Sequence, residues 1–111
     1  MKLVKMNEAK RLILHYLSRK AGSISGNTYH EGKNPGTNPK IFILISGTIK
    51  FSTRHKNFSD IEKYILSTPC VMSIPPFIIH KIEAITDIIM LECNSIADIQ
   101  QDRYKLDVEI A

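Results

Sequence analysis

The sequence has 111 residues, of which 43% are hydrophobic and 23% charged, and its net charge is +4 at pH 7. These values are ordinary for one globular domain, and a chain of this length buries enough surface to fold without a disulfide or a metal. No apolar run approaches ~18 residues, so no membrane-spanning helix is expected. The positive charge is spread along the chain without interleaved aromatic residues. This predicts no nucleic-acid partner and only a mild preference for anionic ligands.

The two cysteines, Cys70 and Cys93, have neither a CxxC spacing nor histidines at the distance that zinc fingers use. We therefore interpret them as small buried hydrophobic residues rather than as a disulfide or a zinc site. The segment from Met1 to Lys20 carries too many charges for a signal peptide. The expected location is the cytoplasm, without membrane association.

The first forty residues combine an ambiguous element with a turn-rich stretch. Residues 1–10 are polar and basic, and we interpret them as a flexible lead-in. Arg11 to Ser18 fits either a helical stripe or a sandwich strand with two apolar faces, and the turns that follow favour the strand. Gly22 to Pro39 holds four of the five glycines and predicts a functional loop region, with a short strand at Asn27 to His30.

Strand patterns dominate the middle of the chain. Lys40 to Ser46 is a continuous apolar run, typical of a strand that is buried on both faces. Apolar and polar residues alternate from Ile49 to Arg54, and further strands are predicted at Ile61–Leu66, Cys70–Ile74, Ile78–Ile85 and Ile88–Glu92. Seven or eight short strands at intervals of about ten residues predict an all-β sandwich or barrel.

The stretch from Ile74 to Glu92 carries the sharpest signal. Its Pro75-Pro76 pair cannot donate ladder hydrogen bonds, so it marks the beginning of a strand. Alternation then places His80 on the inner face of that strand, and Ile79, with two charged residues, on the outer face. Thr86-Asp87 is interpreted as the tight turn of a hairpin.

The remaining segments carry weaker signals. His15 and His55 are interpreted as solvent-exposed surface residues. Ser95 to Gln101 predicts a short helix with a serine at its N-cap, and Asp102 to Ile110 is interpreted as a polar tail.

The spacing of these residues resembles the two motifs of the cupin superfamily of small jelly-roll barrels. Gly22 followed by Thr28-Tyr29-His30, and then Lys40 and Gly47 with six residues between them, matches the spacing of the first motif. Pro75-Pro76-Phe77 followed by His80 matches that of the second. The resemblance implies an all-β, cupin-type double-stranded β-helix over residues 11–94 and a C-terminal extension over 95–111 that contains the short helix.

The motif positions that hold a metal in a typical cupin, three histidines and a glutamate, differ in this chain. They are Thr28, His30, Lys40 and His80. A lysine ammonium repels a divalent cation, so no cofactor is expected. The alternative is a metal that His30 and His80 hold without further ligands.

The segment GNTYHEGKN and the strand that follows it most resemble the cupins of sugar-nucleotide and surface-polysaccharide pathways. The resemblance implies a sugar-nucleotide or related carbohydrate ligand and a metal-independent epimerase or ketoisomerase. On this hypothesis His30 is the base, His80 is a relay or second acid–base group, and Lys40 stabilises the enolate.

Four further residues are predicted to contact this ligand. Lys33, Lys50 and Arg54 are candidates for binding its diphosphate, and Thr28 is expected beside the catalytic group.

The alternative hypothesis is a non-catalytic cupin that serves as a ligand-binding or structural dimerisation module. The replacement of the first motif histidine by Thr28, and of the glutamate by Lys40, favours this hypothesis. Phe77 stands in place of a motif glycine and narrows the mouth of the barrel. A homodimer is expected in either case, because the apolar strand at Ile41 to Ile45 offers a sheet face for pairing. The sequence does not decide whether the protein is an enzyme.

Overall fold

The computed structural model describes residues 14–33, 35–93 and 102–105, and these residues form β-strands and one short 3-10 helix, η1 (Pro35–Thr37). The strands are β1 (Leu14–Arg19), β2 (Ile24–Tyr29), β3 (Lys40–Ser46), β4 (Thr48–His55), β5 (Glu62–Ser67), β6 (Cys70–Ile74), β7 (Ile78–Ala84), β8 (Ile88–Cys93) and β9 (Tyr104–Lys105). The prediction of an all-β fold is confirmed. The described residues contain no helix that is long and apolar enough to cross a membrane.

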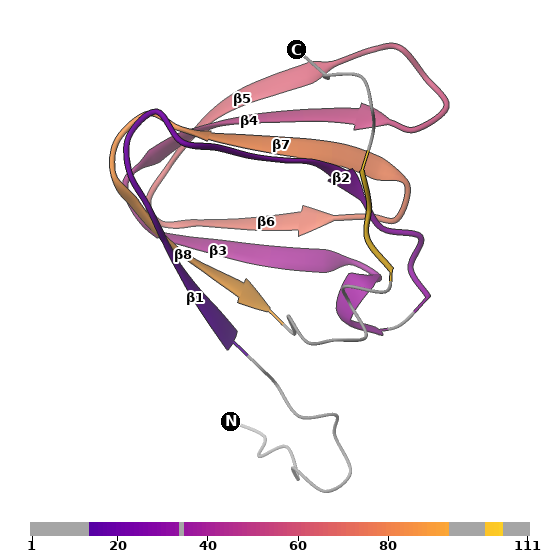
Figure 1. Cartoon of the computed structure of the whole chain (residues 1–111), viewed down its shortest axis with the longest axis horizontal. Coiled ribbons are helices and arrows are strands. Elements are labelled where there is room, and N and C mark those ends of the chain that lie inside the picture. The colour runs from indigo at the N-terminus through magenta and orange to yellow at the C-terminus, as the bar shows by residue number, and fades with distance from the viewer. Residues whose placement is uncertain (1–13, 34, 94–101, 106–111) are drawn as a thin grey trace, which may run out of the picture.

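The strands form two antiparallel sheets that lie against each other (Figure 1). One sheet has four strands in the order β1-β8-β3-β6, and the other has five in the order β5-β4-β7-β2-β9. Within the described part of the chain, only the β4–β5 connection joins two strands of the same sheet. Every other connection between consecutive strands crosses to the opposite sheet, as expected of a jelly roll.

The hydrophobic core lies between the two sheets, where each strand contributes the residues of one face. Ten buried residues form it: Phe42, Leu44, Ile49, Phe51, Met72, Ile74, Ile82, Ala84, Ile88 and Met90. Full burial of one large apolar side chain contributes about 1.5–3 kcal/mol, so this cluster holds the sheets together. Because alternation has a period of two, the same inner faces also receive Lys40 from β3 and His80 from β7.

The predicted hairpin at Thr86-Asp87 is wrong. β7 belongs to the five-stranded sheet and β8 to the four-stranded sheet, so the turn carries the chain from one sheet to the other (Figure 1). Its actual neighbour is the connection between β3 and β4. There the Thr48 amide donates to Thr86 Oγ1 at 3.0 Å, and the Thr86 amide donates to the Thr48 carbonyl at 3.3 Å.

Two predictions about burial are also wrong. β3 has the predicted bounds, but only its inner face is closed, and Ile45 is 46% exposed. The first strand is not a sandwich strand with two buried faces. β1 pairs only with β8 and lies at the edge of its sheet, with Leu14 48% and Tyr16 60% exposed.

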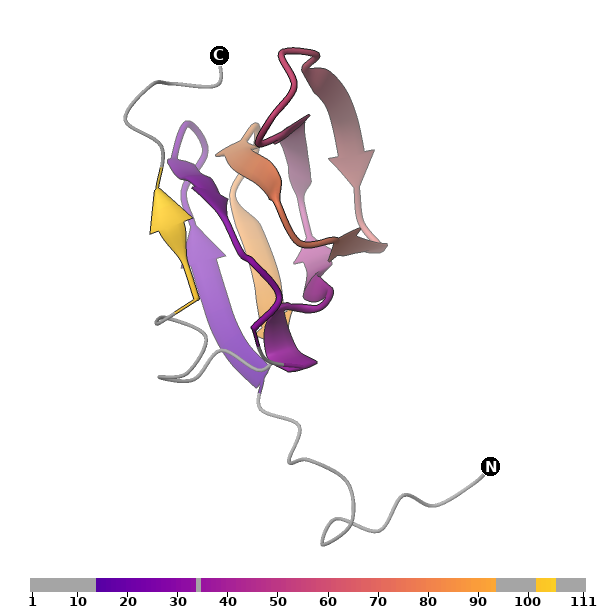
Figure 2. The same cartoon turned by 90° about the vertical axis from the view of Figure 1, so that its right-hand side faces the viewer.

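Residues 102–105, which the sequence predicted to lie in a polar tail, contact the barrel. β9 extends the five-stranded sheet beside β2 (Figure 2), and Tyr104 stacks on Tyr29 with ring centroids 5.3 Å apart. The two rings cover Ile79, which is fully buried although alternation places it on the outer face. The predicted lead-in at residues 1–10 and the predicted helix at residues 95–101 lie outside the described residues.

Candidate functional site

The structure brings together the three residues predicted to form the catalytic group, at one end of the barrel interior. His30 follows β2 directly, Lys40 begins β3 and His80 lies in β7. The imidazole rings of His30 and His80 have centroids 5.6 Å apart and planes tilted by 31°. The exposed fractions of His30, His80 and Lys40 are 4%, 3% and 0%, so the group is closed off from solvent.

Local backbone geometry in β2 sets the position of His30. The register of β2 against β7 shifts between Gly26 and Thr28, and Asn27 between them has a φ of 61°. Gly26 has a φ of +108°, and a Cβ there would lie 2.6 Å from the carbonyl oxygen of His80. Glycine therefore allows the two backbones to approach at the histidine site. Thr28 is the cross-strand partner of His80.

The turn before β7 fits the second motif of the resemblance. Phe77 has a φ of 67°, a left-handed conformation that favours glycine, and it occupies the position of the motif glycine. The Phe77 amide donates to the carbonyl of His30 at 2.7 Å, which ties the two motif regions together.

Both histidines have one ring nitrogen bonded to a backbone carbonyl. His30 Nδ1 lies 2.7 Å from the carbonyl oxygen of Asp102, and His80 Nδ1 lies 3.3 Å from that of Ile78. A carbonyl oxygen accepts and does not donate, so in the neutral rings each Nδ1 carries the proton. Each Nε2 then has a free lone pair that can accept a proton.

Burial keeps both rings neutral at pH 7. Desolvation lowers the pKa of His80 to about 4, against the opposing effect of the Ile78 carbonyl. Desolvation also lowers the pKa of His30, and the nearby Lys40 charge acts in the same direction, while the bond to Asp102 opposes both.

Glu92 is a site residue that the sequence interpretation did not assign. Its Oε2 lies 2.7 Å from Lys40 Nζ, which also donates to the carbonyl of Cys93 at 3.0 Å. Both charged residues occupy inward positions of apolar strands, and Glu92 is the cross-strand partner of Phe42. Lysine and glutamate are almost never fully buried unless they are paired. Two opposite charges at inward positions were therefore the signal for this ion pair.

Asp102 was also missed. Its carboxylate accepts hydrogen bonds from the amides of Glu31 at 2.9 Å and Lys33 at 2.8 Å and from Thr37 Oγ1 at 2.6 Å. Burial favours a higher pKa for this carboxyl group, but the three donors outweigh it and lower the pKa below its ordinary value. These bonds span 65 to 71 residues of sequence, so no local pattern marks Asp102 as part of the site.

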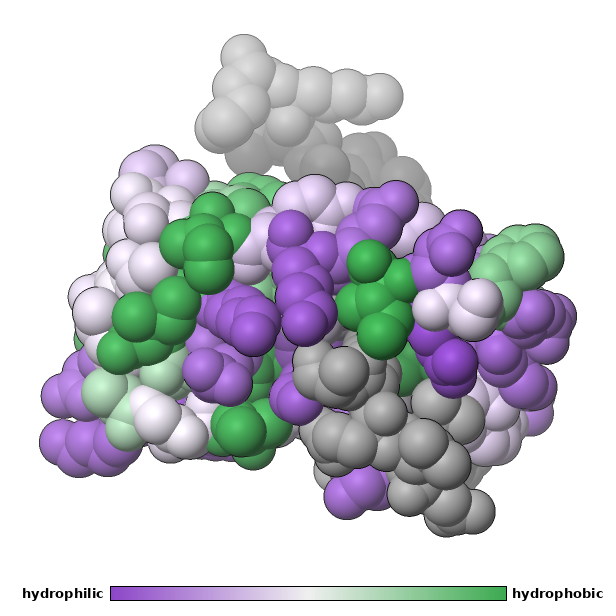
Figure 3. Space-filling view, turned by 90° about the horizontal axis from the view of Figure 1, so that it is seen from above, coloured by the Kyte–Doolittle hydropathy of each residue, from purple (hydrophilic) through white to green (hydrophobic). Residues whose placement is uncertain are grey.

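The three predicted diphosphate-binding cations do not gather at the histidines. Lys33 is largely exposed and contacts Glu31 Oε1 at 3.3 Å and the Tyr104 hydroxyl. Thr53 is the cross-strand partner of the inward-facing His80, so Thr53 also faces inward. Lys50 and Arg54 alternate with the inward positions and therefore lie on the outer face of β4. On the side of the molecule where the five-stranded sheet lies, hydrophilic residues are interspersed with single hydrophobic ones (Figure 3).

The donor set does not fit a metal ion. Among the residues that the structure describes, no group of three histidine, cysteine, aspartate or glutamate side chains is arranged to hold one. The carboxylate of Glu92 is already paired with the Lys40 ammonium, and Thr28, the cross-strand partner of His80, offers only a neutral hydroxyl as a ligand.

Apart from the Cys93 carbonyl, which accepts from Lys40 Nζ, the other histidines and the cysteines take no part in this group. His15 is exposed, as predicted, whereas His55 is half-buried against Phe58, with ring centroids 4.7 Å apart. Both cysteines are free; Cys93 is buried, as predicted, whereas Cys70 is half-buried.

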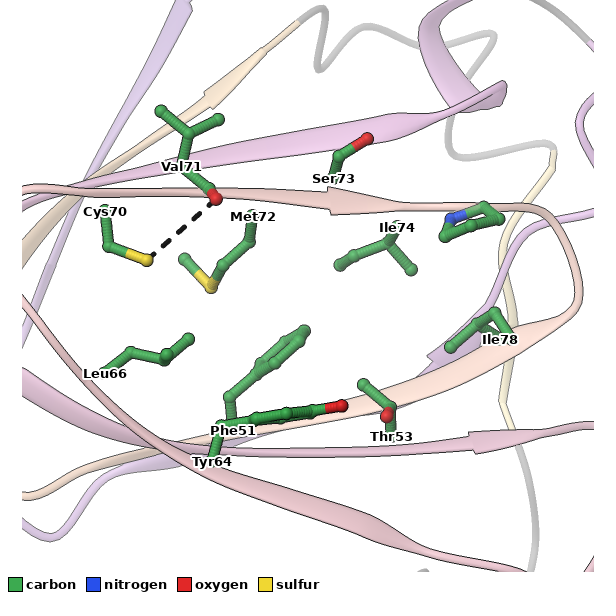
Figure 4. Close-up of a pocket in the computed structure, with 11 residues that line it drawn as sticks. Phe51, Thr53, Tyr64, Leu66, Cys70, Val71, Met72, Ser73, Ile74 and Ile78 are labelled. Atoms are coloured by element: carbon green, nitrogen blue, oxygen red, sulfur yellow. Dashed lines mark hydrogen bonds between the residues drawn. The ribbon is translucent and has the colours of Figure 1, made fainter.

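An apolar cleft of about 400 Å³ opens beside the site, between β5 and β6 at the edges of the two sheets. Figure 4 shows Phe51, Tyr64 and Leu66 on one wall and Met72 and Ile74 on the other. None of its lining residues is charged. Thr53 and Ile74 line the cleft and are the cross-strand partners of His80 and Lys40, so the cleft borders the buried group.

No protein-family model matches this sequence, and no curated protein matches it. Solved structures do. The capsular polysaccharide assembling protein CapF from Staphylococcus aureus is 31% identical with a TM-score of 0.69, over 86% of this chain and 26% of that chain. This chain therefore spans about a quarter of the length of CapF.

Two enzymes have the same fold at lower identity. The sugar 3,4-ketoisomerase QdtA from Thermoanaerobacterium thermosaccharolyticum, in complex with TDP, is 15% identical with a TM-score of 0.64, over 88% of this chain and 67% of that chain. The dTDP-4-dehydrorhamnose 3,5-epimerase from Sulfolobus tokodaii is 17% identical with a TM-score of 0.64, over 94% and 63%.

Proposed function

We propose that this chain, which has the jelly-roll fold of a cupin, binds a sugar nucleotide or related carbohydrate and transfers a proton next to a ketone without a metal. The observation that carries the proposal is the pair of neutral, buried imidazoles 5.6 Å apart, each with its Nδ1 bonded to a carbonyl. Isomerisation or epimerisation of a ketosugar needs a base near the α-carbon and a stabilising group for the enolate oxygen.

His30 is the better candidate for the base. Its Nε2 would take the carbon-bound proton and form an imidazolium, which then returns the proton to the same or the neighbouring carbon. A pKa of about 4 makes His80 a weak base, so its role is that of a hydrogen-bond partner or relay beside His30.

Lys40 would stabilise the negative charge that develops on the enolate oxygen. An ammonium has three N–H donors. Two of them are directed at Glu92 and at the Cys93 carbonyl, which leaves one for a ligand oxygen. Glu92 would hold the ammonium in place, since its carboxylate lies 2.7 Å away.

The related structures support a carbohydrate ligand. CapF, at 31% identity, is described as a capsular polysaccharide assembling protein. QdtA has been crystallised with TDP, and a point mutant of QdtA with TDP-4-keto-6-deoxyglucose. These two nucleotides are therefore the first probes to use.

Thermal-shift measurements with TDP and TDP-4-keto-6-deoxyglucose test binding. A ligand present at 100 times its Kd stabilises the folded protein by about 2.7 kcal/mol, which raises the melting temperature measurably. The proposal fails if neither probe, nor any other sugar nucleotide in a panel, raises the melting temperature.

Deuterium exchange into the sugar ring in deuterated water tests catalysis. His30→Ala and His80→Ala are each expected to abolish the exchange while leaving the fold intact, and His15→Ala, at an exposed site on β1, is the matched control. Exchange that persists in His30→Ala would refute His30 as the base.

A second function, that of a dimerisation module, is favoured by a different observation. We define the outer apolar face as the outward residues of the four-stranded sheet: Leu14, Tyr16, Ile41, Ile43, Val71, Ile89 and Leu91. No outward position of β1, β3, β6 or β8 in the described chain is charged. Such a face suits a second copy of the chain, because identical apolar surfaces match across a two-fold axis.

The cytoplasmic location of the protein stays a prediction.

A further inference from the structure

We propose that Asp102 is a positioning residue for His30: its backbone carbonyl fixes the Nδ1–H tautomer of the ring, and its own carboxylate holds that carbonyl in place. The importance of this tautomer for catalysis rests on the proposed function, in which His30 acts as a base and needs a free lone pair on Nε2. The geometry itself does not depend on any substrate.

The bond from His30 to Asp102 determines which ring nitrogen carries the proton. His30 Nδ1 and the Asp102 carbonyl oxygen are 2.7 Å apart, and both groups are buried, with exposed fractions of 4% and 1%. In a buried site an Nδ1 without its proton would face the carbonyl lone pairs with no hydrogen bond, which is unfavourable. The Nε2–H tautomer is therefore disfavoured while this carbonyl stays in place.

The carboxylate of Asp102 anchors that carbonyl to the loop that follows His30. Oδ1 accepts from the Glu31 amide at 2.9 Å, and Oδ2 accepts from the Lys33 amide at 2.8 Å and from Thr37 Oγ1 at 2.6 Å. Hydrogen bonds to a carboxylate are stronger than those between neutral groups. Asp102 thus ties the described C-terminal segment, residues 102–105, both to the loop that follows His30 and to η1.

Contacts beyond Asp102 hold the same segment from a second direction. β9 pairs with β2 through Thr28 and Tyr29, and the ring of Tyr104 stacks on that of Tyr29 at 5.3 Å. The segment therefore cannot shift along the sheet without breaking a strand pairing. It follows that a correctly protonated His30 requires the C-terminal segment to be docked.

Nitrogen-15 NMR of the full-length protein, labelled at histidine, tests this inference. The two ring nitrogens of each neutral tautomer have distinct chemical shifts, and the His30 signals are identified by their loss in His30→Gln. At neutral pH the wild type is expected to show His30 as the Nδ1–H tautomer. Detection of His30 as the Nε2–H tautomer would overturn the proposal.

Asp102→Ala removes the three anchoring bonds and is expected to convert His30 to a mixture of tautomers or to the Nε2–H form. Asp87→Ala is the matched control, since the exposed Asp87 also accepts from a backbone amide, that of Ala21 at 2.9 Å, but lies away from His30. A folded Asp102→Ala that keeps the pure Nδ1–H tautomer would show that Asp102 does not position the ring.

Thr37→Val covers the case in which Asp102→Ala does not fold. It removes one donor, Thr37 Oγ1, at nearly constant shape, and is expected to lower the population of the Nδ1–H tautomer. An unchanged tautomer in Thr37→Val would then count against the proposal.

Kinetics separate this role from the proposed function. Asp102→Ala is expected to slow deuterium exchange by ~10²-fold while leaving the affinity for TDP within about twofold, as loss of a correctly protonated base predicts. If no sugar nucleotide undergoes exchange with the wild type, the proposed function fails, and the NMR measurement still decides the role of Asp102.

Discussion

At the scale of single residues, burial of His80 makes stability depend on pH. In the unfolded chain His80 takes up a proton below its ordinary pKa of 6.5, whereas in the folded protein it stays neutral down to about 4. Between these values the unfolded state binds more protons, so the free energy of unfolding falls as the pH falls from 6.5 to about 4 and levels off below. The expected loss from His80 is about 3 kcal/mol.

Urea denaturation at pH values between 7 and 4 measures this loss, with His80→Gln and His15→Gln for comparison. His80→Gln should remove the part of the pH dependence that His80 contributes and leave the part that comes from the lowered pKa values of His30 and Asp102, whereas His15→Gln, at an exposed position, should keep all of it. Parallel curves for the wild type and His80→Gln would mean that His80 does not titrate in this window.

At the scale of elements, substitutions at two glycines distinguish the cost of backbone strain from the cost of a steric clash. Gly47, between β3 and β4, has a φ of +97°, and a Cβ there would lie 2.4 Å from the Asp87 carbonyl oxygen and 2.7 Å from Ile88 Cγ2. Gly22 has a similar φ of +89°, with nothing within 4 Å of the added Cβ. Gly22→Ala should cost about 1–2 kcal/mol from φ alone, and Gly47→Ala about 1–3 kcal/mol more.

The free energies of unfolding of the two variants, measured in urea, check this difference. Gly47 lies where the β3–β4 and β7–β8 connections touch, so the comparison also tests whether these connections pack together. Equal losses in the two variants would mean that they do not.

At the scale of the whole molecule, the outer apolar face predicts a homodimer. A stable interface buries about 800 Å² on each partner, and a charge placed within it is costly. Val71→Lys should therefore weaken dimerisation by at least ~10-fold, which corresponds to about 1.4 kcal/mol. Ile65→Lys is the control, since Val71 and Ile65 are both 65% exposed but Ile65 lies on the outer face of the other sheet.

Sedimentation velocity over a range of concentrations measures the effect. The wild type and Ile65→Lys should sediment as dimers under conditions in which Val71→Lys is largely monomeric. A wild type that stays monomeric throughout would exclude the outer apolar face as an interface between copies of this chain.

The sequence by itself was enough to determine the all-β class, the bounds of β3 and β6, and the inward direction of His80. Each of these depends on a pattern within a few residues, either alternation or an unbroken apolar run, and such a pattern is a local property of a strand. The resemblance to cupins also placed His30, Lys40 and His80 near one another before any pairing was known. The inward charges at Lys40 and Glu92 could have predicted the ion pair by the same local reasoning.

Only the tertiary structure decided which strands pair, and with them the neighbours of the histidines. All but one of the connections between consecutive described strands cross from sheet to sheet, so turn residues such as Thr86-Asp87 do not reveal their partners. The pairing of β4 with β7 showed which face of β4 points inward. Lys50 and Arg54 lie on the opposite face and therefore do not reach the site. His30 and Asp102 are separated by 72 residues of sequence, so no local pattern could predict the hydrogen bond between them.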